Sequence, residues 1–390
     1  MRQISESLDR AEASGAAQRK VDPRFSEAIK PATLSIVVPT FNERENVREL
    51  VTRLDRCLAG INWEAVFVDD DSADETIGIL RAIARSDGRV RLLHRIGRRG
   101  LSSAVVEGIL STNAPFVAVM DCDLQHDESL LPRMYNQLRG SNYDVVVASR
   151  YLADGGVRDW EKSRRRISGI ANNLARAILR EKLTDPMSGF FVIKRQAFDG
   201  AVRQLSKRGY KILLDILLSA RPRLKVMEMP YRFRNRVYGE SKLDFGVAWD
   251  YLTLLLDKSA GRIVPVNFIM FSAVGAVGLA VHMLVLASAN RAVGLSFVTS
   301  QFLATIVAMT FNFFLNNLLT YRDKRLYGLW PVVAGLLSFY ISCGIGAIAN
   351  VGVGSALFAF GYPWWLSGMV GVLVGGVWNY ATTSVFTWRR

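Results

Sequence analysis

The 390-residue sequence is poor in the residues that cross-link small folds or bind soft metals. It has three cysteines, Cys57, Cys122 and Cys343, which lie far apart, and three histidines that form no ligand spacing. This sparse spacing argues against a disulfide framework and against a zinc centre. We expect the soluble part of the chain to occupy a reducing compartment. The histidines are expected to be structural.

Charged residues are absent from three long stretches near the carboxyl end. Residues 263–290, 292–321 and 328–388 contain no Asp, Glu, Lys or Arg. A membrane-spanning helix needs about 20 apolar residues, and a Gly-Tyr-Pro turn at 361–363 divides the longest stretch in two. The sequence therefore predicts a domain over 263–390 with four transmembrane helices, at about 264–289, 296–320, 330–358 and 363–387.

Basic residues flank the predicted spans mainly on one side. They are Lys258, Arg262, Arg322, Lys324, Arg325, Arg389 and Arg390, and the opposite side has only Arg291. The positive-inside rule predicts a multi-pass protein of the cell (inner) membrane, with the soluble domain and both termini in the cytoplasm.

The second and fourth predicted spans end alike. Asn379 follows Asn312, and Thr387 follows Thr320, by 67 positions in each case. This spacing predicts an internal repeat of two helical hairpins. The alternative is that such residues recur at any membrane interface.

The remaining chain combines a tail with an α/β pattern. Residues 1–30 hold six basic and five acidic side chains and no apolar core, which predicts a mobile or amphipathic tail. Within 31–242, β-rich runs at 34–39, 65–69, 90–94, 116–121 and 145–149 alternate with helical patterns. This alternation predicts a mostly parallel, Rossmann-like sheet, whose ligands bind beyond the carboxyl ends of the strands.

Positive charge is concentrated next to the predicted membrane domain. Residues 158–242 hold 21 basic and 8 acidic side chains, nearly all of the net charge of +14. Without a nucleic-acid-binding motif, phosphate substrates and anionic lipid headgroups are the expected partners, and nucleic acid is not.

Two segments have amphipathic patterns typical of interface helices, one over 164–182 and one, next to the membrane, over 243–262. In the first, Ile167, Ile170, Ala171, Leu174 and Ile178 share one face, and Arg165, Arg176 and Arg180 occupy the rest. Ordinary helices packed on the soluble core are the alternative for both.

Carboxylates follow several predicted strands. Asp121-Cys122-Asp123 comes directly after one strand, with Gln125 close behind. Residues 39–43 and 69–71 end earlier strands on the same expected edge. Two carboxylates one residue apart suit a hard cation that bridges phosphates. Loop and helix capping is the alternative for the carboxylates of 69–71.

These segments, with Gly100–Ala104 and the run Asp185-Pro186-Met187-Ser188-Gly189-Phe190-Phe191, resemble the inverting GT-A family of dolichyl-phosphate mannose synthases and their bacterial polyprenyl-phosphate relatives. The resemblance covers about 34–243, and the four-helix part resembles a GtrA-type membrane domain. Phe41 stands where the family often has Tyr, and Cys122 where Ala is common.

The resemblance implies the residues of the site. The donor nucleotide and its phosphates would contact Pro39, Phe41, Glu43, Val68, Asp70, Asp121, Cys122, Asp123, Gln125, Arg236 and Lys242. Mg²⁺ or Mn²⁺ would bind Asp121, Asp123 and Gln125, and the lipid phosphate would bind Arg150, Arg164 and Ser168. The catalytic residues would be Asp123, Arg150, Arg164 and Asp185, with Asp185 orienting the acceptor or a sugar hydroxyl.

The implied reaction transfers a hexose, with inversion, to a polyprenyl (dolichyl or undecaprenyl) phosphate for cell-envelope or protein glycosylation. Because a phosphate monoester is mostly dianionic at neutral pH, no strong general base is needed. GDP-mannose is the favoured donor and UDP-glucose the second. A processive polysaccharide synthase would carry a Gln-x-x-Arg-Trp motif that this sequence lacks. A translocator of lipid-linked sugars is the alternative from another class, and a homo-oligomer is left open.

Overall fold

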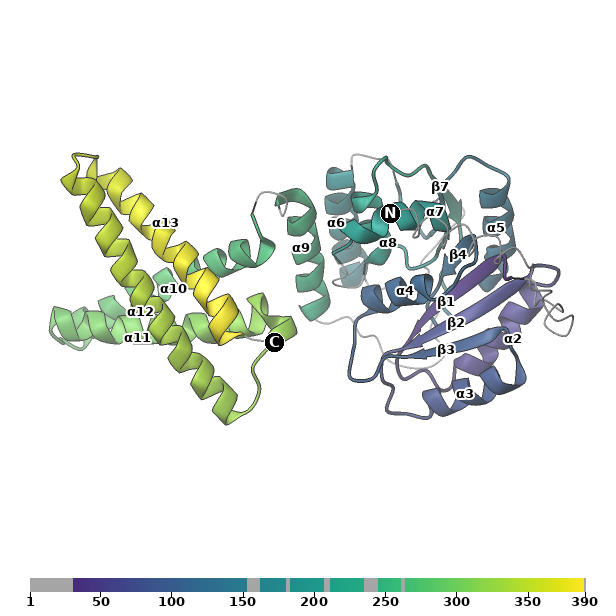
Figure 1. The fold of residues 1–390 in the computed structure, drawn as a ribbon, viewed down its shortest axis with the longest axis horizontal. Helices are drawn as coiled ribbons and strands as arrows, with labels where there is room; N and C mark the ends of the chain where they lie inside the picture. Colours follow the sequence, from purple (N-terminus) through teal and green to yellow (C-terminus); the bar gives the residue numbers. More distant parts are fainter. Residues whose placement is uncertain are drawn as a thin grey trace, which may run out of the picture. The chain divides into compact units, whose positions relative to one another are not determined.

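The chain forms two compact units, Met1–Lys242 and Leu243–Arg390, in a computed structural model (Figure 1). The structure describes residues 31–152, 162–179, 183–206, 211–234, 245–260 and 264–388. The predicted tail over 1–30 lies outside these residues.

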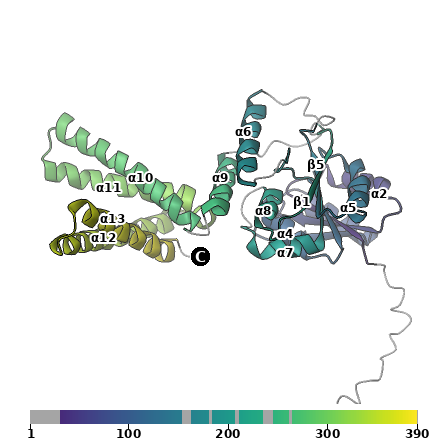
Figure 2. The ribbon, with the colours of Figure 1, turned by 90° about the horizontal axis from the view of Figure 1, so that it is seen from above.

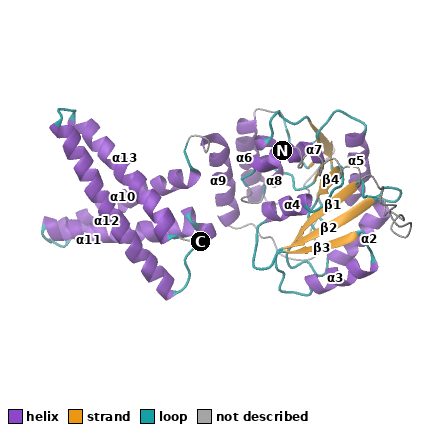
Figure 3. Ribbon diagram, in the orientation of Figure 1, coloured by secondary structure: helices purple, strands orange, loops and turns teal. Residues whose placement is uncertain are grey.

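A seven-stranded sheet forms the centre of the first unit (Figure 3). Its strands are β1 (Leu34–Thr40), β2 (Trp63–Asp69), β3 (Val90–His94), β4 (Phe116–Val119), β5 (Val145–Ser149), β6 (Phe191–Lys194) and β7 (Val226–Pro230). They lie in the order β3-β2-β1-β4-β6-β5-β7, and all neighbours are parallel except those of β6. The predicted mostly parallel α/β sheet is thus confirmed.

The strands β6 and β7 were not predicted. In β6, Phe191, Val192 and Ile193 are fully buried, so the strand has no polar alternation and is only four residues long. A short, uniformly apolar run carries no period that distinguishes a strand from a buried helix. Because β6 runs antiparallel between β4 and β5, the residues that precede it lie where those two strands end.

Helices cover both faces of this sheet. They are α2 (Val47–Cys57), α3 (Thr76–Ser86), α4 (Leu101–Leu110), α5 (Leu131–Arg139), α6 (Lys162–Leu179), α7 (Arg195–Ala201) and α8 (Ile212–Ser219), with short 3₁₀ turns at Glu128–Leu130 and Val202–Gln204. Strand residues alternate between faces. Ile36 and Val38 accordingly join the core with α2, α3 and α5. On the other face α4 approaches so closely that Gly108 leaves no room for a Cβ against Val37 and Val68.

The second unit consists of helices. They are α9 (Phe245–Ala260), α10 (Val266–Ala287), α11 (Phe297–Leu315), α12 (Leu329–Ala359) and α13 (Trp364–Thr382), with π-helical turns at Ser288–Ala292, Asn316–Thr320 and Thr383–Thr387 and a 3₁₀ turn at Arg322–Lys324. Four spans, Val266–Ala292, Phe297–Thr320, Leu329–Ala359 and Trp365–Thr387, are long and apolar enough to cross a membrane. Figure 2 shows them as two pairs, α10 with α11 and α12 with α13.

The two pairs share details that agree with the predicted repeat. The π-helical turns that follow α11 and α13 begin at Asn316 and Thr383, which are 67 positions apart. Asn312 packs against Gly278 of its partner helix, and Asn379 packs against Gly346 in the same way, with no room for a Cβ at either glycine. Small residues at such contacts let apolar helices approach closely in a membrane.

An aromatic cluster joins the two pairs. It consists of Phe313, Tyr321, Phe339 and Trp388, all buried. Tyr321 and Trp388 occupy equivalent positions of the repeat, and their rings stack with centroids 4.1 Å apart and planes 10° apart. The Trp388 indole N–H donates to Asn317 Oδ1 at 3.0 Å.

Replacing Trp388 by Ala should therefore destabilise the second unit. Loss of a buried Trp side chain costs about 3–5 kcal/mol. Thermal unfolding of the detergent-solubilised protein should show a lower midpoint for Trp388→Ala than for Trp378→Ala, because Trp378 is 40% exposed. Equal midpoints for the two variants would contradict a role for the cluster.

Candidate active site

The predicted site residues gather where the strand order reverses. Strands β1, β2 and β3 proceed in one direction and β4 lies on the other side of β1, and ligands of such sheets bind beyond the strand ends at this point. Pro39 and Val68, both predicted to hold the nucleotide, are direct neighbours across β1 and β2.

The turns after these strands have strained backbones. Among the described residues, the non-glycine positions with positive φ are Asn42 (53°), Asp71 (61°) and Leu124 (60°), which follow β1, β2 and β4. Asn and Asp tolerate this conformation, whereas for a buried Leu it is unfavourable. Such strain persists where the surroundings enforce it, commonly at functional sites. The turn that holds Asp123 and Gln125 is therefore fixed by the fold.

The turn after β1 is tied to the start of α3. The backbone N–H of Glu43 donates to Thr76 Oγ1 at 2.9 Å, and the Glu43 carboxylate accepts from Asn46 Nδ2 at 2.7 Å. Phe41 is partly buried, and the Arg99 guanidinium lies 4.4 Å from its ring centroid. A flat surface of this kind suits a nucleobase.

The three carboxylates after β2 have separate partners. Asp69 accepts from the N–H and hydroxyl of Ser72 at 2.8 and 2.6 Å, so it caps its own turn. Asp70 is ion-paired with Arg95 and accepts from the Gly100 N–H at 2.7 Å, and burial raises the pKa of Asp70.

Asp71 faces the end of β3. It lies 2.8 Å from His94 Nε2 and accepts from the Gly97 N–H at 3.0 Å, and the hydrogen bond to His94 lowers the pKa of Asp71. All three carboxylates thus shape the loop next to the predicted nucleotide site.

Asp121 and Asp123 follow β4 as predicted. Asp121 is 38% exposed at its side chain, and Asp123 is buried. His126 supports Asp121, because its Nδ1 accepts from the Asp121 N–H at 3.0 Å and its Nε2 lies 3.7 Å from Asp121 Oδ2. His126 also stacks on Phe190 at 5.2 Å. A Cβ at Gly189 would lie 3.3 Å from Asp121 Oδ2, so the glycine allows this close approach.

These side chains fit a hard divalent cation. Gln125 Nε2 donates to the Arg234 carbonyl at 3.1 Å, which leaves its amide oxygen as the acceptor for a cation. In the part of the chain that the structure describes, no three His, Cys, Asp or Glu side chains could together hold a metal ion. Two carboxylates and one amide leave coordination positions for phosphate oxygens, as Mg²⁺ sites commonly do.

Arg150 is fixed by Asp185. Its Nε and Nη2 donate to the two oxygens of Asp185 at 2.7 and 2.9 Å, and Asp185 is fully buried. Burial disfavours the charged form of Arg150, but the bond to Asp185 prevails and raises its pKa. The Asp185 N–H donates to Glu228 in β7 at 2.8 Å. Asp185, which the family resemblance implies to orient the acceptor or a sugar hydroxyl, thus binds Arg150 in the structure.

Tyr231 is a site residue that the sequence did not reveal. It follows β7 as Arg150 follows β5, and these strands pair Ser149 with Pro230. Its ring packs against His126, Phe190 and Phe233. Burial raises the pKa of Tyr231, and Arg150 opposes this. Its hydroxyl is buried without a hydrogen-bond partner among the described residues. No local pattern marks such a residue, since strand pairing alone brings it here.

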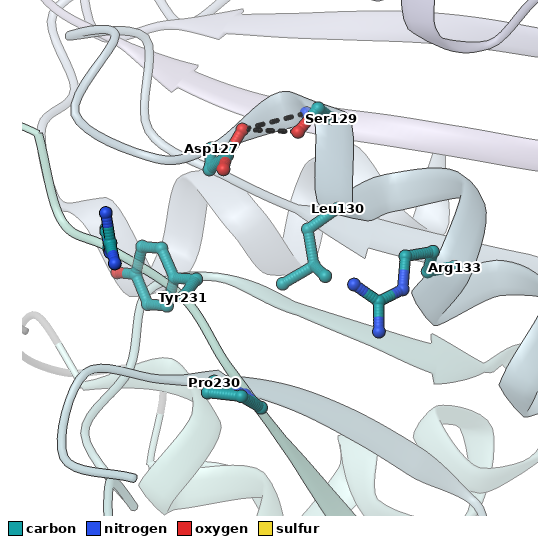
Figure 4. A pocket seen from close by; sticks show the side chains of 7 residues that line it. Asp127, Ser129, Leu130, Arg133, Pro230 and Tyr231 are labelled. Atoms are coloured by element: carbon teal, nitrogen blue, oxygen red, sulfur yellow. Dashed lines mark hydrogen bonds between the residues drawn. The ribbon is translucent and has the colours of Figure 1, made fainter. Parts of the chain in front are cut away.

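A cavity of about 250 Å³ adjoins Tyr231 (Figure 4). Its lining consists of Asp127, Ser129, Leu130, Arg133, Pro230, Tyr231 and Arg232. Arg234 lies close by in sequence and binds Asp127 and Glu128 at 2.7 Å each. The segment after β7 is thereby fastened to the turn that carries Asp123 and Gln125.

Four predicted residues cannot be placed in this geometry. Arg236 and Lys242 lie outside the described residues, and Arg164 and Ser168 belong to α6 without described side chains. Of the predicted residues, Asp121, Asp123, Gln125, Arg150 and Asp185 follow β4 and β5 or precede β6, at one edge of the sheet.

The described part of α6 shows which of its residues pack on the domain. Among 169 and 171–179, the part of α6 whose burial is described, the buried residues are Asn172, Ala175 and Leu179, whereas Leu174 of the predicted apolar face is 43% exposed. Arg176 donates to the carbonyls of Leu183 and Thr184 at 2.6 and 2.8 Å, so it holds the loop before Asp185 and is not a solvated charge. Asn172 and Ala175 were not assigned to a packed face because neither is strongly apolar.

Replacing Asp185 by Asn should destabilise the first unit. The change leaves Arg150 buried beside a neutral amide, and losing one partner of a buried ion pair costs about 3–5 kcal/mol. The thermal midpoint of the purified protein should fall, whereas Asp199→Asn should leave it unchanged because that side chain is 52% exposed. An unchanged midpoint for Asp185→Asn would show that the pair is not structural.

Two family models match the chain. The model of glycosyl transferase family 2 matches residues 35–200, and the model of the GtrA/DPMS transmembrane domain matches residues 270–388. Among solved structures, glucosyl-3-phosphoglycerate synthase from Mycobacterium tuberculosis covers 58% of this chain and 80% of its own length, with 19% identity and a TM-score of 0.45. That similarity is too remote to bear on the reaction.

Curated relatives cover the chain more fully. The dolichol-phosphate mannosyltransferase of Pyrococcus furiosus is 33% identical over 91% of this chain and 99% of its own length. Those of Mycosarcoma maydis and Saccharomyces cerevisiae are 37% and 33% identical over 60% and 61% of this chain, and over 83% and 91% of their own lengths. The chain therefore belongs to the dolichol-phosphate mannosyltransferase family, within the family 2 glycosyltransferases, and carries a GtrA-type transmembrane domain.

Proposed function

We propose that this protein transfers a mannosyl residue from GDP-mannose to a polyprenyl phosphate, with inversion at the anomeric carbon. The observation that supports this most is the fixed Arg150 guanidinium at the same sheet edge as the Asp121 and Asp123 carboxylates. Arg150 would supply the cation that an acceptor phosphate needs, and the two carboxylates would supply ligands for the metal ion of the donor. The names of the relatives supply the sugar and the lipid.

The donor would lie along the ends of β1, β2 and β4. Pro39, Phe41, Glu43, Val68 and Asp70 would contact the nucleoside, and the aromatic ring of Phe41 would face the base. Asp121, Asp123 and Gln125 would hold Mg²⁺ or Mn²⁺, which supplies positive charge to the departing diphosphate when it is bound. Arg236 and Lys242 are proposed to add charge at the same diphosphate.

The acceptor phosphate would lie beside Arg150. A phosphate monoester has its second pKa near 6, so its oxygen attacks the anomeric carbon as an anion without losing a proton to the protein. The new bond joins that oxygen to the sugar, and the bond from the sugar to the donor diphosphate breaks with its electron pair on GDP. Asp185 holds the Arg150 fork in place, and guanidinium forks match phosphate oxygens well. Arg164 and Ser168 are proposed as further contacts.

The membrane would bring the lipid to this site. The protein is a membrane protein, as its four apolar helices and its GtrA-type domain show. We place the first unit and both termini in the cytoplasm on the basis of the flanking basic residues. The exposed Leu174 supports contact of α6 with lipid, because the face of α6 that packs on the first unit is a different one, with Asn172, Ala175 and Leu179.

The purified full-length protein in vesicles tests the proposal. With GDP-mannose, Mg²⁺ and a polyprenyl phosphate it should form a mannosyl phospholipid, and GDP should compete with the donor far better than UDP does. Mass spectrometry of the lipid products and a competition titration provide the two readings. A glucosyl lipid from UDP-glucose, with UDP as the better competitor, would contradict the choice of donor.

A further inference from the structure

Arg99 is a basic residue that the sequence did not assign to the site. It lies in the loop that joins β3 to α4. Its guanidinium lies over the ring of Phe41, with Cζ 4.4 Å from the ring centroid. Phe41 directly follows β1 and is one of the proposed contacts of the donor nucleoside. A basic side chain thus lies at the proposed place of the base.

The loop around Arg99 is held on both sides by the carboxylates that follow β2. The Gly97 N–H donates to Asp71 Oδ2 at 3.0 Å, and the Gly100 N–H donates to Asp70 Oδ2 at 2.7 Å. Because β2 pairs with β1 along its whole length, these bonds fix the backbone of Arg99 next to the ends of both strands.

The turn that carries Phe41 is held as well. The N–H of the next residue, Asn42, donates to Ser72 Oγ at 2.8 Å, and Asn42 Oδ1 accepts from the Ala73 N–H at 3.0 Å. Both backbones of the contact are therefore fixed, and Arg99 is exposed. A change in this contact needs only a rotation of the Arg99 side chain.

The donors of Arg99 have no acceptor within the described ranges, where this side chain makes no hydrogen bond and no ion pair. The neighbouring Arg98 differs, because its two terminal nitrogens donate to the two oxygens of Glu107 at 2.9 Å each. The fork of Arg99 is thus available to a ligand that lies on Phe41.

The two candidate bases differ in what they offer such a fork. Guanine carries two adjacent acceptors, O6 and N7, on one edge, and a guanidinium binds this pair with two hydrogen bonds. Uracil has a single acceptor, O4, on the corresponding edge, so the same fork makes one bond. A base that stacks on Phe41 takes the place of the guanidinium, and the flexible stem of Arg99 lets the guanidinium move to the edge of that base.

We propose that Arg99 selects the donor nucleotide by binding O6 and N7 of guanine while the base stacks on Phe41. The inference rests on the proposed function and assigns the choice between GDP-mannose and UDP-glucose to this side chain. The contact between Arg99 and Phe41 breaks for either base, so its cost cancels when the affinities for GDP and UDP are compared. The ratio of the two affinities therefore isolates the contact at the edge of the base.

The test measures nucleotide affinity by calorimetry on the purified full-length protein with Mg²⁺. Arg99→Met should lower the ratio of GDP to UDP affinity by about 10-fold, as for loss of one bidentate contact to guanine. Arg99→Lys should recover little of this loss, because an ammonium is a point charge without a fork. Arg98→Met is the matched control in the same loop and should keep the ratio, because Arg98 binds Glu107.

A nucleotide analogue tests the same contact from the side of the ligand. In 7-deaza-GDP a C–H group replaces N7, which removes one of the two acceptors. The unchanged protein should bind this analogue several-fold more weakly than GDP, whereas Arg99→Met should bind the two equally.

Two results would overturn the inference. One is an Arg99→Met variant that keeps the GDP-to-UDP ratio of the unchanged protein, and an equal fall in both affinities would assign Arg99 to the diphosphate. The other is an Arg99→Lys variant that keeps the full ratio, because charge alone would then explain the role. An unchanged protein that prefers UDP would instead contradict the proposed donor, and the inference would fail with it.

Discussion

The buried ion pair between Arg150 and Asp185 is the contact on which the proposed acceptor side of the site depends. It connects the end of β5 to the loop before β6, and Glu228 ties the same loop to β7. A carboxylate that is fully buried is tolerated because a guanidinium and a backbone N–H surround it. Asp185 holds one side of the Arg150 guanidinium, and Arg150 follows β5 at the same edge of the sheet where Asp121 and Asp123 follow β4.

The antiparallel strand β6 explains how that edge becomes complete. A parallel strand would bring its carboxyl end to the site, but β6 brings its amino end. The loop from Asp185 to Phe190 therefore enters beside Asp121 and Asp123, and Gly189 allows it to approach Asp121. The buried Leu124, held at positive φ by its surroundings, lies in the turn after β4 that carries Asp123 and Gln125.

Sequence patterns predicted the parts of this protein that depend on local order. Five strands, four apolar helices and the carboxylates after β4 were found because period, length and strand ends are local signals. The strands β6 and β7, the buried face of α6 and Tyr231 were not found. Each depends on pairing or packing between distant segments: Tyr231 reaches the site through its register with β5, and Asn172 and Ala175 face the core although neither is strongly apolar. Family resemblance supplied the roles of Arg150 and Asp185, but only the structure shows that they bind each other.

In the proposed reaction the lipid phosphate attacks the donor sugar directly, with no sugar-enzyme intermediate. The anomeric configuration of the product tests it most directly. NMR of the mannosyl phospholipid made from GDP-α-D-mannose should show a β linkage, since a single in-line displacement inverts the carbon. An α-linked product would require two displacements through a protein nucleophile and would contradict the account.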